Sequence, residues 1–379
     1  MKILYFGTYS IGPGYPRNCV IIKGLRASGA KVEECHVPLW RDPKDKNRLI
    51  SKLPTFVFSL PSLTLAWIRL TFRFLQMNRD YDVMIVGYTG HLDIFLARLL
   101  NGRRPLVFDA FLSLREALVE DRGLFRAGGL WDRVLKWLDR RAALLADRVL
   151  LDTDEHIVYY ARSACLSRSK FIRVFVGVDE DTFTPRKDPP LEPPMLLYFG
   201  TYLRLHGVDT IIRAAKLLED KNVVIELIGN GPEYPKVRRL ADELGLRNVR
   251  FETKWLDSYS IADRVGVASI CLGIFGTGEK ARRVIPCKVF PALSMAKPLI
   301  TGETPAATEA LRHGENAYLV PLNNPQALAR AIRVLLDDNQ LATNIGLGGV
   351  KTFQERFTPA AIGRELMAEL EKIVVEKRK

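Results

Sequence analysis

The hexapeptide LYFGTY stands at residues 4–9 and again, letter for letter, at residues 197–202. In both copies a short apolar run ends at a glycine, which permits the tight turn that follows a buried parallel strand. Chance similarity of two strand-and-turn segments is the alternative interpretation. We interpret the repeat as the opening strand and turn of two similar halves.

Short β-rich runs alternate with helical patterns in both halves, which is typical of parallel α/β layers. In the first half, strands are expected at residues 3–6, 32–37, 83–86, 106–108, 148–151 and 172–175. In the second half they are expected at residues 196–199, 223–228, 249–251, 267–272, 298–300 and 318–320. The sequence therefore predicts an α/β protein built from two Rossmann-like domains.

The boundary between the domains is predicted from prolines. Five of them fall within residues 184–194, where they exclude regular pairing and favour a stiff, extended connector. We predict a first domain of residues 1–184 and a second of residues 185–358. A last helix is expected after Thr358, which can cap it, and its apolar stripe of Ile362, Leu366, Leu370 and Ile373 needs a surface to cover.

The composition limits the possible partners. Fifty-six Lys and Arg against 43 Asp and Glu give a net charge of +13, which favours phosphates or an acidic membrane surface. Nucleic acid is not an expected partner, because no recognition motif accompanies the charge. A dehydrogenase is not expected either, because neither half opens with G-x-G-x-x-G followed by an acidic partner. Dispersed cysteines and an N-terminus that begins directly as a strand indicate a cytoplasmic protein.

Three loops of the second half follow predicted strands, at residues 200–207, 229–231 and 273–288. Ligands of parallel sheets bind at this edge, where loops and helix N-termini present free N–H groups to phosphate. The third loop adds the positive charges of Lys280, Arg282, Arg283 and Lys288. A solvated basic face is the alternative, less so for Lys288, which stands where a helix is expected to begin.

Several pieces of the second half together resemble a known family. They are Gly177-Val178-Asp179 with Phe183 and Pro185, residues 198–215, residues 227–231, Pro286-x-Lys288, Ala296-Lys297-Pro298, and Glu309 with Gly314 and Asn316. This pattern is similar to glycosyltransferase family four, the large retaining GT-B family. The resemblance implies two Rossmann-like domains whose sheets face across a cleft, with the C-terminal helix, residues 359–379, crossing back to the first domain.

The resemblance also implies a reaction. A sugar would move from a nucleotide-sugar bound by the second domain to a saccharide or lipid-linked acceptor on the first, with retention and without a metal or other cofactor. The chain departs from the family at Arg283 and Pro291, where a glutamate pair is usual, and at Thr201 and His206, where Arg and Lys are usual. A GT-B-like protein that binds nucleotide or sugar without turnover is therefore the alternative function.

The resemblance, together with the loops and positions that follow predicted strands, gives the following site residues. Catalytic roles are expected for Asp109, Lys288 and Arg204, and donor binding for Gly200, Thr201, His206, Gly229, Gly231, Lys280, Arg283, Lys288 and Glu309. On the acceptor side we expect Gly12, Gly14, Arg17, His91 and Asp121, with His156 as a further candidate. The alternatives are loop rigidity for the glycines, structural roles for the histidines and an Asp121–Arg122 pair.

The most apolar stretch, residues 54–68, is too short to span a bilayer and runs into Arg69 and Arg73. It could rest on an anionic membrane, so peripheral attachment to the cytoplasmic membrane face is one interpretation. A buried core helix is the other.

Overall fold

The structure of the chain is a computed structural model that describes residues 1–12, 16–39, 60–121, 123–186 and 191–378. The chain divides into two compact units, one formed by residues 1–176 with residues 359–379 and the other by residues 177–358. The division falls a few residues before the prolines, so the described part of that segment belongs to the second unit.

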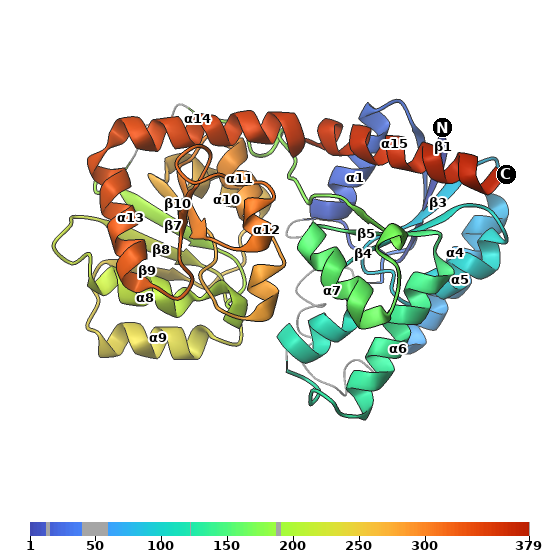
Figure 1. The fold of residues 1–379 in the computed structure, drawn as a ribbon, viewed down its shortest axis with the longest axis horizontal. Helices are drawn as coiled ribbons and strands as arrows, with labels where there is room; N and C mark the ends of the chain where they lie inside the picture. Colours follow the sequence, from blue (N-terminus) through green and yellow to red (C-terminus); the bar gives the residue numbers. More distant parts are fainter. Residues whose placement is uncertain (13–15, 40–59, 122, 187–190, 379) are drawn as a thin grey trace. The chain divides into compact units, whose positions relative to one another are not determined.

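The first unit is built on a parallel sheet with the strand order β2-β1-β3-β4-β5-β6 (Figure 1). Its strands are β1 (Lys2–Gly7), β2 (Lys31–His36), β3 (Val83–Val86), β4 (Leu106–Phe111), β5 (Arg148–Leu151) and β6 (Phe171–Arg173). Both faces of β3 are fully buried, as a parallel strand covered on two sides requires. Continuous apolar runs such as VMIV thus form the centre of the sheet.

Helices cover both faces of this sheet. They are α1 (Pro16–Ala27), α4 (Leu60–Gln76), α5 (Asp93–Asn101), the π-helix η1 (Glu116–Asp121), α6 (Leu130–Leu145), α7 (Asp154–Ala164), the 3₁₀ turn η2 (Arg168–Lys170) and α15 (Pro359–Arg378). Helices α4, α5, α6 and α7 contact one another in that order, whereas α15 lies along α1 (Figure 1). A Cβ at Gly363 would lie only 2.0 Å from the carbonyl oxygen of Gly24, so two glycines permit this crossing.

The second unit repeats the plan with the strand order β12-β11-β10-β7-β8-β9. Its strands are β7 (Met195–Phe199), β8 (Val224–Ile228), β9 (Val249–Glu252), β10 (Ile270–Leu272), β11 (Leu299–Gly302) and β12 (Tyr318–Val320). Its helices are η3 (Arg204–His206), α8 (Val208–Lys216), α9 (Tyr234–Glu243), α10 (Ser258–Val267), η4 (Glu279–Arg282), α11 (Val289–Ser294), α12 (Pro305–Thr308), α13 (Pro325–Asp337) and α14 (Asn339–Arg356).

The twelve predicted strands are confirmed, with small shifts at their ends such as β6, which begins at Phe171. The two LYFGTY copies form β1 and β7 with their turns, and both glycines have positive φ angles. The last helix begins at Pro359 as predicted and belongs to the first unit, where Ile362, Leu366 and Leu370 are buried. No helix in the described part of the chain is long and apolar enough to span a membrane.

Candidate functional site

Three loops of the second unit meet beyond the carboxyl ends of β7, β8 and β10. A Cβ at Gly229 would lie 2.1 Å from the carbonyl oxygen of Gly200, and one at Gly231 would lie 2.7 Å from the backbone of Tyr202. A Cβ at Gly207 would lie 2.4 Å from the backbone nitrogen of Gly276. The glycines at 207, 229 and 231 are therefore needed where one loop backbone packs on another.

Lys288 enters this loop cluster from the residue just before α11. Its side chain is buried, and its ammonium lies 4.2 Å from the centre of the Tyr198 ring. Among the residues that the structure describes, no acceptor is within hydrogen-bonding reach of the ammonium. A Cβ at Gly200 would lie 3.3 Å from the Nζ atom, so the glycine leaves room beside it. This lysine is a buried cation without an anionic partner, which is costly unless a ligand supplies one.

His206 lies beside Lys288. Its Nδ1 atom is 2.8 Å from the hydroxyl of Tyr198 and contacts the carbonyl oxygen of Thr201. Burial lowers the pKa of His206 well below its ordinary value, and the charges of Lys288 and Lys280 lower it further. Burial also lowers the pKa of Lys288, to about 7. A bound anion would reverse both effects by favouring the charged forms.

The other predicted donor residues lie in the same unit and differ in exposure. Arg204 and Thr201 are exposed on the loop after β7, and Lys280 is half-buried in η4, close enough to act on His206. Arg283 is buried and Glu309 is half-buried after α12, where its carbonyl oxygen accepts a hydrogen bond from Arg356. Sequence reasoning missed Tyr198, although it stands in the quoted hexapeptide, because an aromatic strand residue looks like any other core side chain.

In the first unit, Arg17 and Asp109 form a buried ion pair. The Nε atom of Arg17 donates to both carboxylate oxygens at 2.7 and 2.9 Å, and an Nη atom donates to the carbonyl oxygen of Val174 at 2.8 Å. Arg17 also lies over the ring of Phe111. Burial raises the pKa of Asp109, although Arg17 opposes that shift. Asp109 has no exposed surface, and both of its carboxylate oxygens accept a hydrogen bond from Arg17.

A second buried charge cluster lies on neighbouring elements. His156, at the start of α7, is 2.7 Å from Asp152 through Nδ1 and 2.6 Å from Glu116 of η1 through Nε2. Burial lowers the pKa of His156, but the two carboxylates outweigh it and raise the pKa to about 9. His156 is therefore a histidinium that ties the loop after β4 to the loop after β5.

The remaining acceptor-side predictions are scattered. Gly12 has a φ of +121° with nothing near its missing Cβ, so its backbone conformation is what requires glycine. Gly14 lies outside the described residues. His91 is buried, with its Nε2 atom 2.7 Å from the carbonyl oxygen of Leu112, and Asp121 is half-buried at the end of η1. The structure thus gives His91 a contact with the backbone and joins Arg17 to Asp109.

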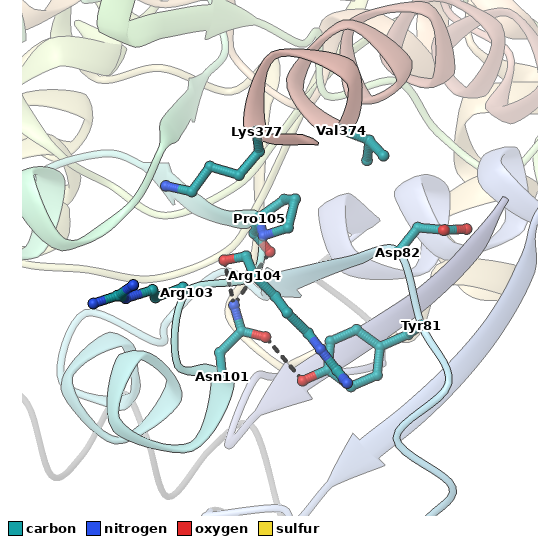
Figure 2. A pocket seen from close by; sticks show the side chains of 8 residues that line it. All are labelled: Tyr81, Asp82, Asn101, Arg103, Arg104, Pro105, Val374 and Lys377. Atoms are coloured by element: carbon teal, nitrogen blue, oxygen red, sulfur yellow. Dashed lines mark hydrogen bonds between the residues drawn. The ribbon is translucent and has the colours of Figure 1, made fainter. Parts of the chain in front are cut away.

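A pocket of about 450 Å³ lies elsewhere on the first unit (Figure 2). It is lined by Tyr81, Asp82, Asn101, Arg103, Arg104, Pro105, Val374 and Lys377. Asp82 and Pro105 precede β3 and β4, so the pocket lies at the amino edge of the sheet. Arg104 lies over the Tyr81 ring, and Lys377 pairs with Asp147 at 2.6 Å. This edge is opposite to the one at which the same sheet carries the loops after β1 and β4, where ligands of parallel sheets bind.

The loop cluster around Lys288 coincides with a family match. The family described as glycosyl transferases group 1 matches residues 193–338. This part of the chain is similar to the glycosyl transferases group 1. The chain is 30% identical over 174 residues to the lipopolysaccharide core biosynthesis glycosyltransferase LpsD of Rhizobium meliloti, covering 46% of this chain and 48% of LpsD. It is 24% identical over 210 residues to the D-rhamnosyltransferase WbpZ of Pseudomonas aeruginosa, covering 53% of each. These matches span about half the length of the relatives.

Solved structures extend the similarity from this part of the chain to the whole fold. A sucrose-phosphate synthase from Thermosynechococcus elongatus superimposes with a TM-score of 0.73 and 18% identity over 99% of both chains. HepE of Anabaena in complex with UDP-glucose superimposes with a TM-score of 0.68 and 16% identity over 98% of this chain and 100% of HepE. The fold is GT-B, as the sequence predicted. No group of His, Cys, Asp and Glu side chains suited to a metal ion occurs within the described ranges.

Proposed function

We propose that the chain transfers a sugar from a nucleotide-sugar to a saccharide or lipid-linked acceptor. The observation that supports this most is Lys288, a buried ammonium without an acceptor at the loop edge where parallel α/β sheets bind phosphates. The same loops belong to the part of the chain that matches glycosyl transferases group 1. A nucleoside diphosphate would supply the negative charge that Lys288 lacks.

The chemistry follows from where charge develops. When the bond between the sugar and the diphosphate breaks, negative charge grows on the leaving diphosphate, and fixed cations and N–H groups lower the barrier by stabilising it. Lys288 would contact this group directly, with Lys280 and Arg204 nearer the surface. Retention and metal independence belong to the proposal. They fit a site whose work is to hold two substrates in place rather than to supply a nucleophile.

The acceptor is proposed to bind at the carboxyl edge of the first sheet, near Gly12 and the Arg17–Asp109 pair. Asp109 then acts as a positioning residue, because it forms an ion pair with Arg17 and its side chain is not exposed. We further propose that the protein works in the cytoplasm, peripherally at the membrane, where a lipid-linked acceptor would be found.

A thermal-shift screen with UDP, GDP and their sugars tests the donor site, and turnover with the best binder tests the reaction. We expect one nucleotide to raise the melting temperature and its sugar conjugate to be consumed once an acceptor is added. Lys288→Met should weaken both effects strongly, whereas Lys351→Met, a substitution of an exposed lysine on α14, should weaken neither. A screen without any response would overturn the proposal.

Binding without turnover is the second candidate. It is favoured by Arg283 and Pro291, which are buried where relatives commonly carry glutamates, so no carboxylate stands at those two positions. A nucleotide response without consumption of any sugar conjugate would select this function over transfer.

A further inference from the structure

The outer surface of α6 in the first unit carries a row of exposed apolar side chains. Leu130, Trp137 and Leu144 are exposed by 75%, 52% and 45% and follow one another at intervals of seven residues. Seven residues make about two turns, so the three side chains lie in line along the helix. The opposite side of α6, with Leu135, Ala142 and Ala143, is buried.

The exposed charged side chains beside this row of apolar residues on α6 are all cationic. Arg133, Lys136, Arg140 and Arg141 are all exposed on α6, and the guanidinium of Arg141 lies over the Trp137 ring. The two acidic residues of the helix, Asp132 and Asp139, are buried. The solvent face of α6 therefore combines tryptophan and leucine with positive charge alone.

Helix α4 has the same character. Leu65 and Phe72 are one pair of exposed side chains seven residues apart, and Ile68 and Leu75 are another. Arg69 and Arg73 are exposed beside them, and α4 contains no acidic residue. Only the other side, with Ala66, Leu70 and Phe74, packs on the core. Helix α4 is thus buried on one side and exposes apolar side chains on the other. It agrees in part with both interpretations of this sequence, a core helix and a segment that rests on a membrane.

These two faces belong to one layer. Helix α5 lies between α4 and α6 and contacts both, and it adds Leu99, which is 79% exposed (Figure 1). In the described residues of α4, α5 and α6, nine large apolar side chains and six cationic side chains are exposed. None of the acidic side chains of these described residues is exposed. Exposed apolar patches of this kind mark binding surfaces rather than ordinary solvent-facing helices.

We infer that the outer face of α4, α5 and α6, here called the α4–α6 face, docks on an anionic lipid bilayer. Helices that lie in a membrane interface carry Trp, Phe and Leu beside Lys and Arg, so that rings enter the headgroup region while cations meet anionic lipids. The core of a protein–protein interface is instead depleted of charge. The inference rests on the peripheral membrane attachment proposed above and gives it a surface and a lipid class, and it does not depend on the donor site.

Flotation with lipid vesicles tests it. The wild-type protein is expected to float with vesicles of phosphatidylcholine and phosphatidylglycerol, and to float much less with phosphatidylcholine alone or at high salt. The double variant Arg133→Glu/Arg140→Glu should weaken binding to anionic vesicles by about tenfold or more. Trp137→Ala should weaken it with little loss of melting temperature, because its side chain is half-exposed.

Two controls match these variants in chemistry but lie on the second unit. Arg330→Glu/Lys351→Glu makes the same change in charge at exposed positions, and Leu347→Ala removes an apolar side chain that is 57% exposed on α14. Both should float like the wild type. Nucleotide response measured on the same samples separates failed docking from a failed donor site.

The inference is overturned if the wild type does not bind anionic vesicles, or if the α6 variants and the controls bind alike. It is also overturned if the wild type sediments as a dimer that Trp137→Ala dissociates while vesicle binding is absent. That result would assign the α4–α6 face to a second copy of the chain.

Discussion

The ammonium of Lys288 lies 4.2 Å above the ring of Tyr198 and has no hydrogen-bond acceptor among the described residues. The ring offers a cation a weak, electrostatic attraction, worth about 0.5–2 kcal/mol, which is far less than water gives an ammonium. Burial therefore lowers the pKa of Lys288 to about 7. A lysine held in this way is ready to be charged by an arriving anion.

The first prediction concerns the pH dependence of nucleotide binding. A bound diphosphate favours the charged lysine and raises its pKa above 7. Above that pH the free lysine is largely neutral and must take up a proton on binding, so affinity should fall by up to about tenfold per pH unit. Below it Lys288 adds no pH dependence. Titration calorimetry in buffers of different ionisation enthalpy measures the proton uptake, and Lys288→Met should remove it; an unchanged uptake in that variant would refute the assignment.

The second prediction concerns the Arg17–Asp109 pair. Asp109→Asn removes the negative charge but leaves a buried guanidinium, which should lower the free energy of unfolding by about 3–5 kcal/mol. Arg17→Met/Asp109→Leu removes both charges and should recover most of that loss. Urea unfolding of the wild type and both variants supplies the measurement. A double variant less stable than Asp109→Asn would show that the unpaired guanidinium is not the cause of the lost stability.

The third prediction concerns His156. Its pKa is raised to about 9 in the folded protein by Glu116 and Asp152. A raised pKa means that the folded state binds the proton more tightly than the unfolded state, whose pKa is near 6.5. The contribution to stability is therefore complete below that value and disappears as the pH rises through about 9, with a total of roughly 3 kcal/mol.

Urea unfolding from neutral to alkaline pH follows this loss. His156→Gln should be less stable than the wild type at neutral pH, and the difference between the two should shrink as the pH rises. A difference that stays constant across this range would mean that His156 carries no extra proton in the folded state.

The fourth prediction concerns the crossing of α1 and α15. Gly363→Ala would bring a methyl group to 2.0 Å from the Gly24 carbonyl oxygen, so the helices must move apart. We expect a loss of about 1–3 kcal/mol in the free energy of unfolding. Gly278→Ala is the matched control, since nothing lies within 4 Å of its added Cβ. Equal stability of the two variants would contradict the close packing.

Much of the fold could be predicted because buried parallel strands leave a local signal. Runs such as Val83–Val86 are apolar at every position, and the turn after β1 or β7 needs a glycine. The position of Lys288 could be predicted for a similar reason, because a lysine beside Pro286 just before an apolar helix is a local pattern.

The partners of the charged residues could not be predicted. Arg17 and Asp109 stand 92 residues apart, and His156 stands 40 residues from Glu116, so only the folded sheet brings them together. Asp109 looked like a residue facing substrate because it follows the apolar run LVF, yet it lies within β4 and is buried. The face of α6 was missed as well, because apolar and basic residues are mixed along residues 130–145, and only the folded helix shows which apolar side chains face outward beside the cations.

The central claim is that Lys288 binds the diphosphate of a nucleotide-sugar, and a calorimetric comparison of wild type and Lys288→Met tests it most directly. With UDP and GDP as ligands at neutral pH, we expect one to bind the wild type and Lys288→Met to bind it at least about tenfold more weakly, as for the loss of one charge-assisted contact. Because the substitution replaces a buried charge by an apolar side chain of similar length, the variant should melt no lower than the wild type. Equal affinity of the two proteins, or no binding of either nucleotide to the wild type, would contradict the account.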